Sequence, residues 1–332
     1  MKKMILFLSL ILIVILTGCG DDSSGDESSG EKEIKLAHSG SETHQYHIAA
    51  KKFKEVLESN EDVNISVNIH SNAALGSEGD AIEQVLNGSL EMTTVAADSN
   101  LANTVPEMNL FGIPFIFEDK NHVYKALESE AGQNLLKIID EKGMKGMGYW
   151  EVGFRHLSND QHEISTPDDV ENLSIRIQPA SVWEMYFTSL GANPIPVDFN
   201  ELYSALDQGV VDGQENPLPT VNSMKLYEVQ QYITLTAHTY TPAVVLMSEN
   251  FYNNLSDEEV SAVNQAILEA QEYQREELNK QEEDILNMLE KEGITVTEPD
   301  REAFEEATLS VRDDISEKVP SEIIQSFIDS QE

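Results

Sequence analysis

Arginine is the residue type in this sequence best suited to binding an anion, and the chain contains only five of them. Arg275, Arg301 and Arg312 lie in Glu-rich helical sequence, where surface ion pairs are expected. Arg155 and Arg176 stand apart from these acidic runs. A guanidinium group offers two parallel N–H donors to a carboxylate. The sequence therefore indicates a site for a small organic acid at Arg155 and Arg176, with an ion pair to a surface acid as the alternative for Arg176.

Arg176 lies in a segment that has the period of a β-strand. Apolar and polar residues alternate over residues 173–178, and Pro179 ends the run. Helical sequence on both sides predicts a covered sheet, in which the polar face near the end of a strand opens on a ligand crevice. In such a desolvated cleft, each charge-assisted hydrogen bond contributes roughly 1.5 to 3 kcal/mol.

The first residues have the pattern of a secretory signal. Lys2 and Lys3 precede an almost unbroken apolar run of 13 residues, 4–16. A helix needs roughly 20 residues to span a bilayer, so this run is too short for a permanent anchor. We therefore predict that residues 1–18 are a signal peptide and exclude them from the fold.

Cys19 is the only cysteine of the 332 residues, so the chain forms no internal disulfide. Residues 16–19, Leu-Thr-Gly-Cys, resemble the bacterial lipobox, whose cysteine receives a lipid before cleavage. The alternative, a buried free thiol, fits poorly with the polar residues that follow. Residues 20–31 are only Gly, Ser, Asp and Glu, and have nothing apolar to bury. We predict a lipid such as palmitate on Cys19 and a flexible tether over residues 19–32.

The net charge of the chain excludes several classes of partner. Sixty acidic against 21 basic residues give −39, which argues against nucleic acid or an anionic membrane surface. At an ionic strength of about 0.15 M the Debye length is near 8 Å. An anion inside a cleft therefore responds to nearby arginines rather than to the net charge. The excess acid indicates solvated surface, consistent with a saline medium.

Patterns for catalysis and metal binding are missing from the sequence. It contains no G-x-S-x-G, H-E-x-x-H, P-loop or G-x-G-x-x-G motif. Acidic pairs such as Asp168-Asp169 fall at helix starts, where no acid–base role is implied. His38, His44 and His47 suggest a metal cluster, but no cysteine or matched carboxylate completes a ligand shell. We predict neither an enzyme nor a cofactor nor a bound metal.

The N-terminal half predicts alternating strands and helices. Alternation of residue types favours strands at 33–37, 63–69 and 92–96, and helical periodicity or capping favours helices at 46–57 and 79–87. Gly88 has the position of a helix C-cap. This βαβαβ order predicts a parallel sheet with right-handed crossovers.

The C-terminal half predicts a similar arrangement followed by one long helix. After the first helical residue, Pro167, we expect the Arg176 strand, helices at 181–190 and 200–208, and a short strand at 210–212. Ser256 and Glu259 form a capping box that opens a polar helix reaching Glu292. Such a helix is on the order of 55 Å long, enough to brace two lobes.

An ordered set of motifs resembles one protein family. The run 201–217, which includes Asp-Gly-Gln-Glu-Asn-Pro, is similar to the signature of extracytoplasmic solute receptors of tripartite ATP-independent periplasmic (TRAP) transporters. Shorter matches occur in the same order, at 75–78, 153–156, 175–177, 191–194 and 236–240. The resemblance covers roughly residues 34–292.

The resemblance implies an α/β, two-lobed periplasmic-binding-protein-like fold with a hinge and a long helix crossing both lobes. The expected lobe I comprises residues 33–152 plus about 241–280, and lobe II comprises 153–240 plus about 281–332.

The same resemblance implies a function in transport. We expect a monomeric receptor outside the cytoplasm, either on the outer face of the membrane or in the periplasm. It would bind a dicarboxylate or a sugar acid and deliver it to the integral membrane subunits of a TRAP transporter. The alternative is a lipoprotein that senses the solute for a signalling partner.

The resemblance also implies the roles of three residues. Arg176 corresponds to the arginine that binds the ligand carboxylate and acts as the main selectivity element. Arg155 corresponds to a second cationic donor, and Asn216 to an amide contact. These expectations agree with the charge argument for the two arginines.

Five other residues have alternative roles in the sequence. Glu78 follows a Gly-Ser turn, where it either accepts a hydrogen bond from a ligand hydroxyl or complements the helix dipole. Asp98, after a strand end, has the same alternatives, and His38 either touches the ligand or is a loop histidine without a role. Trp150 and Phe199 favour core packing over a place in the pocket wall. Glu78 and His38 favour a hydroxylated sugar acid.

Overall fold

The computed structural model describes residues 31–331. The predicted signal peptide, Cys19 and the tether as far as Gly30 lie outside the described residues. Within the part that is described, no helix is both long enough and apolar enough to cross a bilayer.

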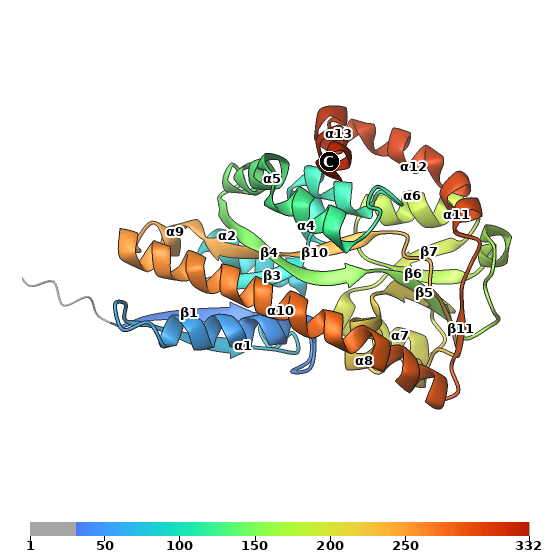
Figure 1. Ribbon diagram of the computed structural model, residues 1–332, viewed down its shortest axis with the longest axis horizontal. Helices are drawn as coiled ribbons and strands as arrows, with labels where there is room; N and C mark the ends of the chain where they lie inside the picture. The colour runs from blue at the N-terminus through green and yellow to red at the C-terminus, as the bar shows by residue number, and fades with distance from the viewer. Residues whose placement is uncertain (1–30, 332) are drawn as a thin grey trace, which may run out of the picture. The chain divides into compact units, whose positions relative to one another are not determined.

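The first sheet has five strands in the order β2-β1-β3-β10-β4 (Figure 1). The strands are β1 Lys32–Ala37, β2 Ile65–His70, β3 Met92–Ala96, β4 Met144–Phe154 and β10 Tyr240–Ser248. β1 pairs in parallel with β2 and β3, which confirms the parallel βαβαβ prediction. β10 runs antiparallel between β3 and β4 and joins the later part of the chain to this sheet.

The second sheet has six strands in the order β11-β9-β5-β8-β6-β7. The strands are β5 His156–Asn159, β6 Ser174–Ile177, β7 Asn193–Pro196, β8 Gly213–Asn216, β9 Tyr232–Thr234 and β11 Thr295–Thr297. β6 pairs in parallel with β7 and β8, and β5 pairs antiparallel with β8 and β9. The strand predicted around Arg176 is therefore confirmed as β6.

Helices connect the strands and cover the two sheets (Figure 1). The α-helices are α1 Gln45–Glu58, α2 Glu78–Asn87, α3 Leu101–Thr104, α4 Lys120–Glu128, α5 Glu130–Asp140, α6 Ser181–Ser189, α7 Leu202–Asp207, α8 Leu218–Ser223, α9 Glu249–Tyr252, α10 Asp257–Lys291, α11 Arg301–Ala307, α12 Leu309–Asp314 and α13 Ser321–Ile328. Short 3-10 helices lie at Pro106–Gly112, Pro167–Val170, Phe199–Glu201, Leu226–Glu228, Ile315–Glu317 and Asp329–Gln331.

The short strand predicted at 210–212 is wrong, because the chain is still completing a helix end there. Gly209 has a φ of 65°, a left-handed conformation that glycine adopts at little cost. The Val210 N–H donates to the Ala205 carbonyl at 2.9 Å, and the Val210 side chain is 53% exposed. The next strand, β8, begins only at Gly213.

Helix α10 is 35 residues long and begins with the predicted capping box of Ser256 and Glu259. It packs on α1 and β4 beside the first sheet and on α8 and β11 beside the second. Figure 1 shows the helix running past elements of both sheets. The prediction of a long helix crossing both lobes is therefore confirmed.

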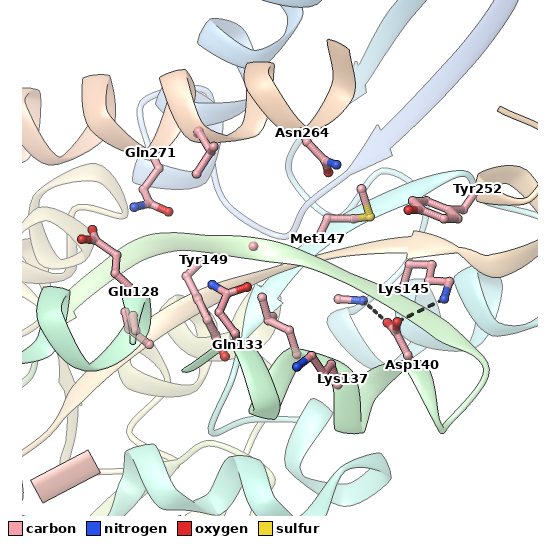
Figure 2. Close-up of a pocket in the computed structure, with 15 residues that line it drawn as sticks. Glu128, Gln133, Lys137, Asp140, Lys145, Met147, Tyr149, Tyr252, Asn264 and Gln271 are labelled. Atoms are coloured by element: carbon pink, nitrogen blue, oxygen red, sulfur yellow. Dashed lines mark hydrogen bonds and ion pairs between the residues drawn. The ribbon is translucent and has the colours of Figure 1, made fainter. Parts of the chain in front are cut away.

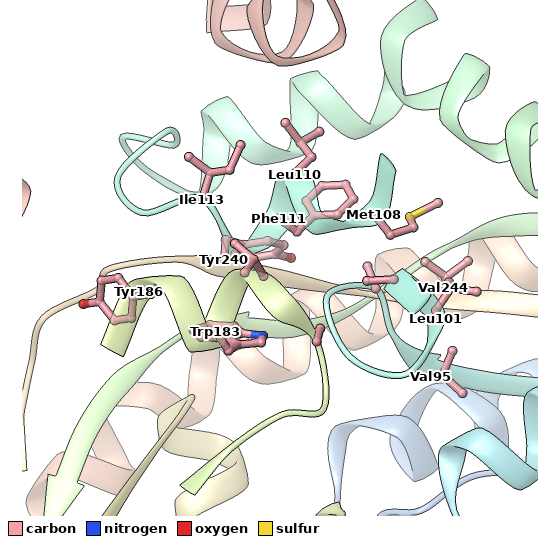
Figure 3. Packing of buried hydrophobic residues seen from close by; sticks show 14 of the residues in the cluster. Val95, Leu101, Met108, Leu110, Phe111, Ile113, Trp183, Tyr186, Tyr240 and Val244 are labelled. Carbon is pink, nitrogen blue, oxygen red and sulfur yellow. The ribbon is translucent and has the colours of Figure 1, made fainter. Parts of the chain in front are cut away.

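The main hydrophobic core contains side chains from the first sheet, from α6 and from the C-terminal helices. Figure 3 shows Trp183 and Tyr186 of α6 close to Tyr240 of β10, with Phe111 beyond them. The Phe111 ring meets Phe327 of α13 at a centroid distance of 5.6 Å. Because α12 packs on α6 while α13 packs on α5, the C-terminal helices contact elements from both expected lobes. The lobe boundaries therefore stay a prediction.

Gln274 of α10 is a buried polar residue that fixes the long helix to the first sheet. Its Nε2 donates to the Gln45 carbonyl at 2.8 Å and to the Glu151 carbonyl at 3.0 Å. Its Oε1 accepts the Glu151 backbone N–H at 2.7 Å. One fully buried amide therefore connects α10 with both α1 and β4.

Replacing Gln274 with alanine should destabilise the fold, since it leaves buried backbone groups of Gln45 and Glu151 without partners. Each such group costs about 1–3 kcal/mol, so we expect a loss of about 2–4 kcal/mol in the free energy of unfolding, measured by urea denaturation. Gln265→Ala on the same helix is the control, because its exposed amide bonds only to Glu269 and should change stability by no more than about 0.5 kcal/mol. Equal losses in the two variants would contradict this role.

Candidate functional site

Arg176 is a buried guanidinium group without an acidic partner. Its side chain is 1% exposed, because Ile175 and Ile177 of β6 take the opposite face of the strand into the core. Nε donates to the Val197 carbonyl at 2.8 Å, while Nη1 is buried and has no partner. Burial lowers the pKa of Arg176 to about 10, so the group still carries its charge at neutral pH. Arg176 forms no ion pair with any residue in 31–331, which contradicts the surface ion pair considered from the sequence.

Arg155 has the opposite environment, because it is paired with a buried acid. It lies between β4 and β5, and its Nε contacts Oε2 of Glu215 on β8. Nη2 donates to Oε1 of Glu215 at 2.8 Å, and both side chains are at most 1% exposed. Burial opposes ionisation of Glu215, but the Arg155 charge together with hydrogen bonds from His238 and Arg155 outweighs it and holds the pKa of that carboxyl below its ordinary value. The guanidinium expected to contact ligand is thus already neutralised by the protein.

Asn216, predicted as an amide contact for ligand, takes part in the Arg155 network. Its Oδ1 accepts from Nη2 of Arg155 at 3.1 Å, and its Nδ2 donates to Gln214 at 2.5 Å. The Arg155 Nη1 donates to Thr241 at 3.3 Å, and the Arg155 guanidinium lies 5.2 Å from the Trp183 ring centre. These bonds hold the amide and the guanidinium in fixed positions.

Asp98 connects elements of the two sheets. Its Oδ2 accepts from the Thr241 hydroxyl at 2.6 Å, and its Oδ1 accepts from Gln178 Nε2 at 3.2 Å. Its backbone carbonyl accepts from the Trp183 indole at 2.7 Å. Asp98 follows β3, whereas Gln178 follows β6 and Trp183 lies on α6. Burial raises the pKa of Asp98 to about 6, and the Arg155 charge opposes that rise.

Glu78 lies at the first turn of α2 and faces the cation of Arg176. The carboxyl is 7% exposed, and its Oε1 accepts from the Ser39 hydroxyl at 3.0 Å and from the Tyr46 hydroxyl at 3.2 Å. Burial raises the pKa of Glu78 to about 7. Hydrogen bonds from Ser39, Tyr46 and the Ala96 N–H, and then the Arg176 charge, act against this rise. The side chain is therefore a buried acid in the charged cluster rather than only a surface complement to the helix dipole.

Three neighbouring histidines, His38, His44 and His47, make two separate sets of contacts. His38 Nε2 lies 3.1 Å from His47 Nδ1, and burial lowers the pKa of His38 to about 3, so its ring is neutral. The His44 ring lies 5.5 Å from the Phe199 ring and contacts Thr220 through Nε2. Across residues 31–331, no three His, Cys, Asp or Glu side chains are grouped in a way that could hold a metal ion.

Trp150 lies in the hydrophobic core, as the sequence predicted. Its ring packs at 6.2 Å from Phe53, and its indole N–H donates to the Ile267 carbonyl at 3.2 Å. Phe199 is partly buried against an apolar cluster that includes Leu202 and Leu226, and it also contacts His44.

The sequence analysis did not identify three residues that bond to Arg155 or Asp98: Glu215, Thr241 and Gln178. The available signal was strand β8, which consists of Gly, Gln, Glu and Asn, all of them buried. A buried strand without apolar side chains requires polar partners, because unpaired buried polar groups are costly. Read with Arg155, that composition would have indicated an internal partner for the arginine.

A pocket of about 430 Å³ lies elsewhere, between α5, β4 and α10 (Figure 2). Its charged groups already have partners. Asp140 accepts from Lys145 at 3.1 Å and from the Gly146 N–H at 3.1 Å, and Glu128 at the rim pairs with Arg275. None of the predicted site residues lines this pocket. The buried, unpaired cation is at Arg176 instead, so we place the candidate site there.

Residues 36–318 match the family described as bacterial extracellular solute-binding protein, family 7. The chain belongs to this family. It is 33% identical to the 2,3-diketo-L-gulonate-binding periplasmic protein of Escherichia coli over 295 residues, 88% of this chain and 90% of that protein. The resemblance to TRAP solute receptors, drawn from the motifs, is therefore confirmed.

Two solved structures of solute-binding proteins share the fold. The sugar acid binding protein of Advenella mimigardefordensis, in complex with galactonate, is 34% identical with a TM-score of 0.88, and the alignment covers 91% of this chain and 98% of that one. A TRAP periplasmic solute binding protein of Bordetella, with density interpreted as pantoate, is 34% identical with a TM-score of 0.87, over 91% of this chain and 100% of that one. The predicted two-lobed α/β fold class is confirmed.

Replacing Glu215 with glutamine should strongly destabilise the protein, because it leaves the Arg155 charge buried and unpaired. Removing one partner of a buried pair costs about 3–5 kcal/mol, measured as the free energy of chemical unfolding. The control is Glu128→Gln, which breaks the more exposed pair with Arg275 and should cost at most about 1 kcal/mol. A Glu215→Gln variant as stable as the control would contradict the buried pair.

Proposed function

We propose that this TRAP solute receptor binds an organic acid that carries one carboxylate and several hydroxyl groups. The observation that supports the proposal most strongly is Arg176, a buried cation that forms no direct ion pair within residues 31–331 and has an unpartnered Nη1. An uncompensated buried charge is costly, and a bidentate ligand carboxylate would compensate it.

The charges around Arg176 favour a singly charged ligand over a dicarboxylate. Arg155 and Glu215 neutralise each other, which leaves Arg176 facing Glu78, with Asp98 close to Arg155. One ligand carboxylate balances Arg176. A second would enter a desolvated space that already holds buried acids and would be repelled by them.

Three relatives support the same ligand class. The Escherichia coli protein binds 2,3-diketo-L-gulonate, the Advenella structure contains galactonate and the Bordetella structure has density interpreted as pantoate. Each of these acids combines one carboxylate with hydroxyl groups. In this chain, Glu78, Ser39 and Tyr46 are polar groups that would bind ligand hydroxyls.

Access of a ligand to the site requires the two expected lobes to separate, since Arg155 and Arg176 are each only 1% exposed. The chain crosses between the sheets at Arg155, at residues 235–239 and along α10. We propose these crossings as the hinge between lobe I and lobe II, with the boundaries expected from the sequence. Closure of the two lobes would form the hydrogen bond between Gln178 Nε2 and Asp98 Oδ1.

Replacing Arg176 with alanine should abolish acid binding and leave the fold intact. Loss of two charge-assisted hydrogen bonds predicts a drop in affinity of about 100-fold or more, measured by calorimetry. In a thermal-shift panel, galactonate and pantoate should raise the Tm of the unaltered protein more than succinate does, because ligands that bind only the native state stabilise it.

The matched control for that experiment is Arg312→Ala, an arginine at the surface that bonds only to Gln325. Its ligand affinity should equal that of the unaltered protein. The proposed function would be contradicted if Arg176→Ala bound the acid with unchanged affinity, or if no acid of the panel raised the Tm.

We also propose that the mature protein is a monomer held by a lipid on Cys19 to the outer face of the cytoplasmic membrane. The lipobox-like residues 16–19 and the polar stretch 20–31 support this anchor. From there the receptor would deliver its ligand to the membrane subunits of the transporter.

Replacing Cys19 with alanine should move the protein from the membrane fraction to the soluble fraction and abolish palmitate labelling, because the lipidated sulfur is gone. Cell fractionation with immunoblotting measures the first effect. Ser24→Ala in the same polar stretch is the control and should remain in the membrane fraction. Membrane association that survives Cys19→Ala would rule out this anchor.

A further inference from the structure

The Glu78 carboxyl has one oxygen, Oε2, that is suited to hold a proton. Both side-chain donors, Ser39 and Tyr46, bond to Oε1. No side chain in the described part of the chain donates to Oε2. Glu78 is also 7% exposed, so water cannot fully solvate its charge. The Ala96 backbone N–H also hydrogen-bonds to the carboxyl. Because Oε2 accepts from no side chain of residues 31–331, it is the oxygen with a lone pair left for a proton, from where its O–H can donate to a bound acid.

The charged form of Glu78 is supported by neutral donors and by one cation. The hydroxyls of Ser39 and Tyr46 and the Ala96 backbone N–H at the end of β3 hydrogen-bond to it, and Arg176 on β6 is the cation that acts on it. Tyr46 on α1 is a neutral donor, and the nearby His38 ring is neutral as well. No second cation compensates Glu78 directly, because Arg155 is paired with Glu215.

A ligand carboxylate and the Glu78 carboxylate therefore compete for the same guanidinium group. When an acid binds Arg176, it takes up the positive charge and adds a negative charge to the same desolvated region. Like charges in such a region favour the neutral form of the weaker acid. We propose that the site binds the organic-acid anion together with one proton from solvent, which converts the Glu78 carboxylate into a carboxylic acid. This inference rests on the proposed function of Arg176.

The protonation state of the free site agrees with this coupling. Burial already raises the pKa of Glu78 to about 7, so about half of the unliganded molecules carry the proton at neutral pH. Asp98 is the competing acid, with a pKa raised to about 6. Both of its oxygens already accept side-chain hydrogen bonds, from Thr241 and Gln178, and these bonds support its charged form.

The sign of the pH dependence follows from the rise in the pKa of Glu78 on binding. Below pH 7 the free site is already protonated, so affinity is highest there and nearly constant. Above pH 7 affinity falls, by up to about tenfold per pH unit, until the pKa of the complex is passed. Proton uptake should be about half a proton per ligand at pH 7 and approach one near pH 8.

Calorimetry with galactonate, on the full mature chain, tests the proposal. Titrations at pH 6, 7 and 8 in phosphate and in imidazole, which differ in ionisation enthalpy, give the number of protons taken up. Glu78→Gln imitates the protonated acid, so it should bind without proton uptake and with a Kd that does not change over this pH range. Glu128→Gln is the control and should keep the proton uptake of the unaltered protein.

A measurement without ligand complements this experiment. Potentiometric titration of the free protein should show one group near pH 7 that is missing in Glu78→Gln. Circular dichroism verifies that the Glu78→Gln variant is folded. The number of protons measured by calorimetry of the unaltered protein in two buffers does not depend on this variant.

The outcomes separate the two proposals. Galactonate binding with no proton uptake, or with uptake that persists in Glu78→Gln, overturns the coupling and leaves the receptor function intact. Uptake that disappears in Asp98→Asn instead assigns the proton to Asp98 and overturns the role of Glu78. Absence of the group near pH 7 in the free protein also overturns it. Failure of every acid in the thermal-shift panel overturns both proposals.

Discussion

The burial of two guanidinium groups at the junction of the two sheets is the constraint on which the rest of the site depends. Charges removed from water need partners. Within residues 31–331, Arg155 forms a direct ion pair with Glu215, whereas Arg176 forms none and keeps an unpartnered Nη1. The Arg155–Glu215 pair is internal and compensated, so it serves as a fixed support. We propose that a ligand compensates the charge of Arg176. On this proposal, Arg155 stabilises the fold and Arg176 binds the ligand.

The fold maintains this difference through elements that cross between the sheets. Arg155 occupies the link from β4 to β5, and Asp98 bonds to Thr241 on β10 as well as to Gln178 beyond β6. Gln274 fixes α10 to the first sheet. These are hydrogen bonds between segments far apart in the sequence, so the geometry of the site depends on the relative position of both sheets. If the two lobes close in the way that we propose, closure also assembles the site.

Local patterns predicted the elements that carry the site, because period and capping are local properties. Alternation found β6 and so placed Arg176, and the Ser256 capping box found α10. The pairing of Arg155 with Glu215 lay beyond such reasoning, because sixty positions separate the two residues and no local pattern reports a contact over that distance. At 210–212 two adjacent valines suggested a strand, although the left-handed Gly209 keeps them in a helix end.

The acidity of the chain acts differently at its surface and inside the site. At the surface, salt screens a net charge of −39 within about a Debye length, so an anion can approach. Inside the site the carboxyls of Glu78 and Asp98 are buried, so water and salt screen them less. These two acids act against further negative charge, whereas Glu215 is compensated by Arg155. The proton uptake that we propose for Glu78 would lower the negative charge of the site as an anion binds.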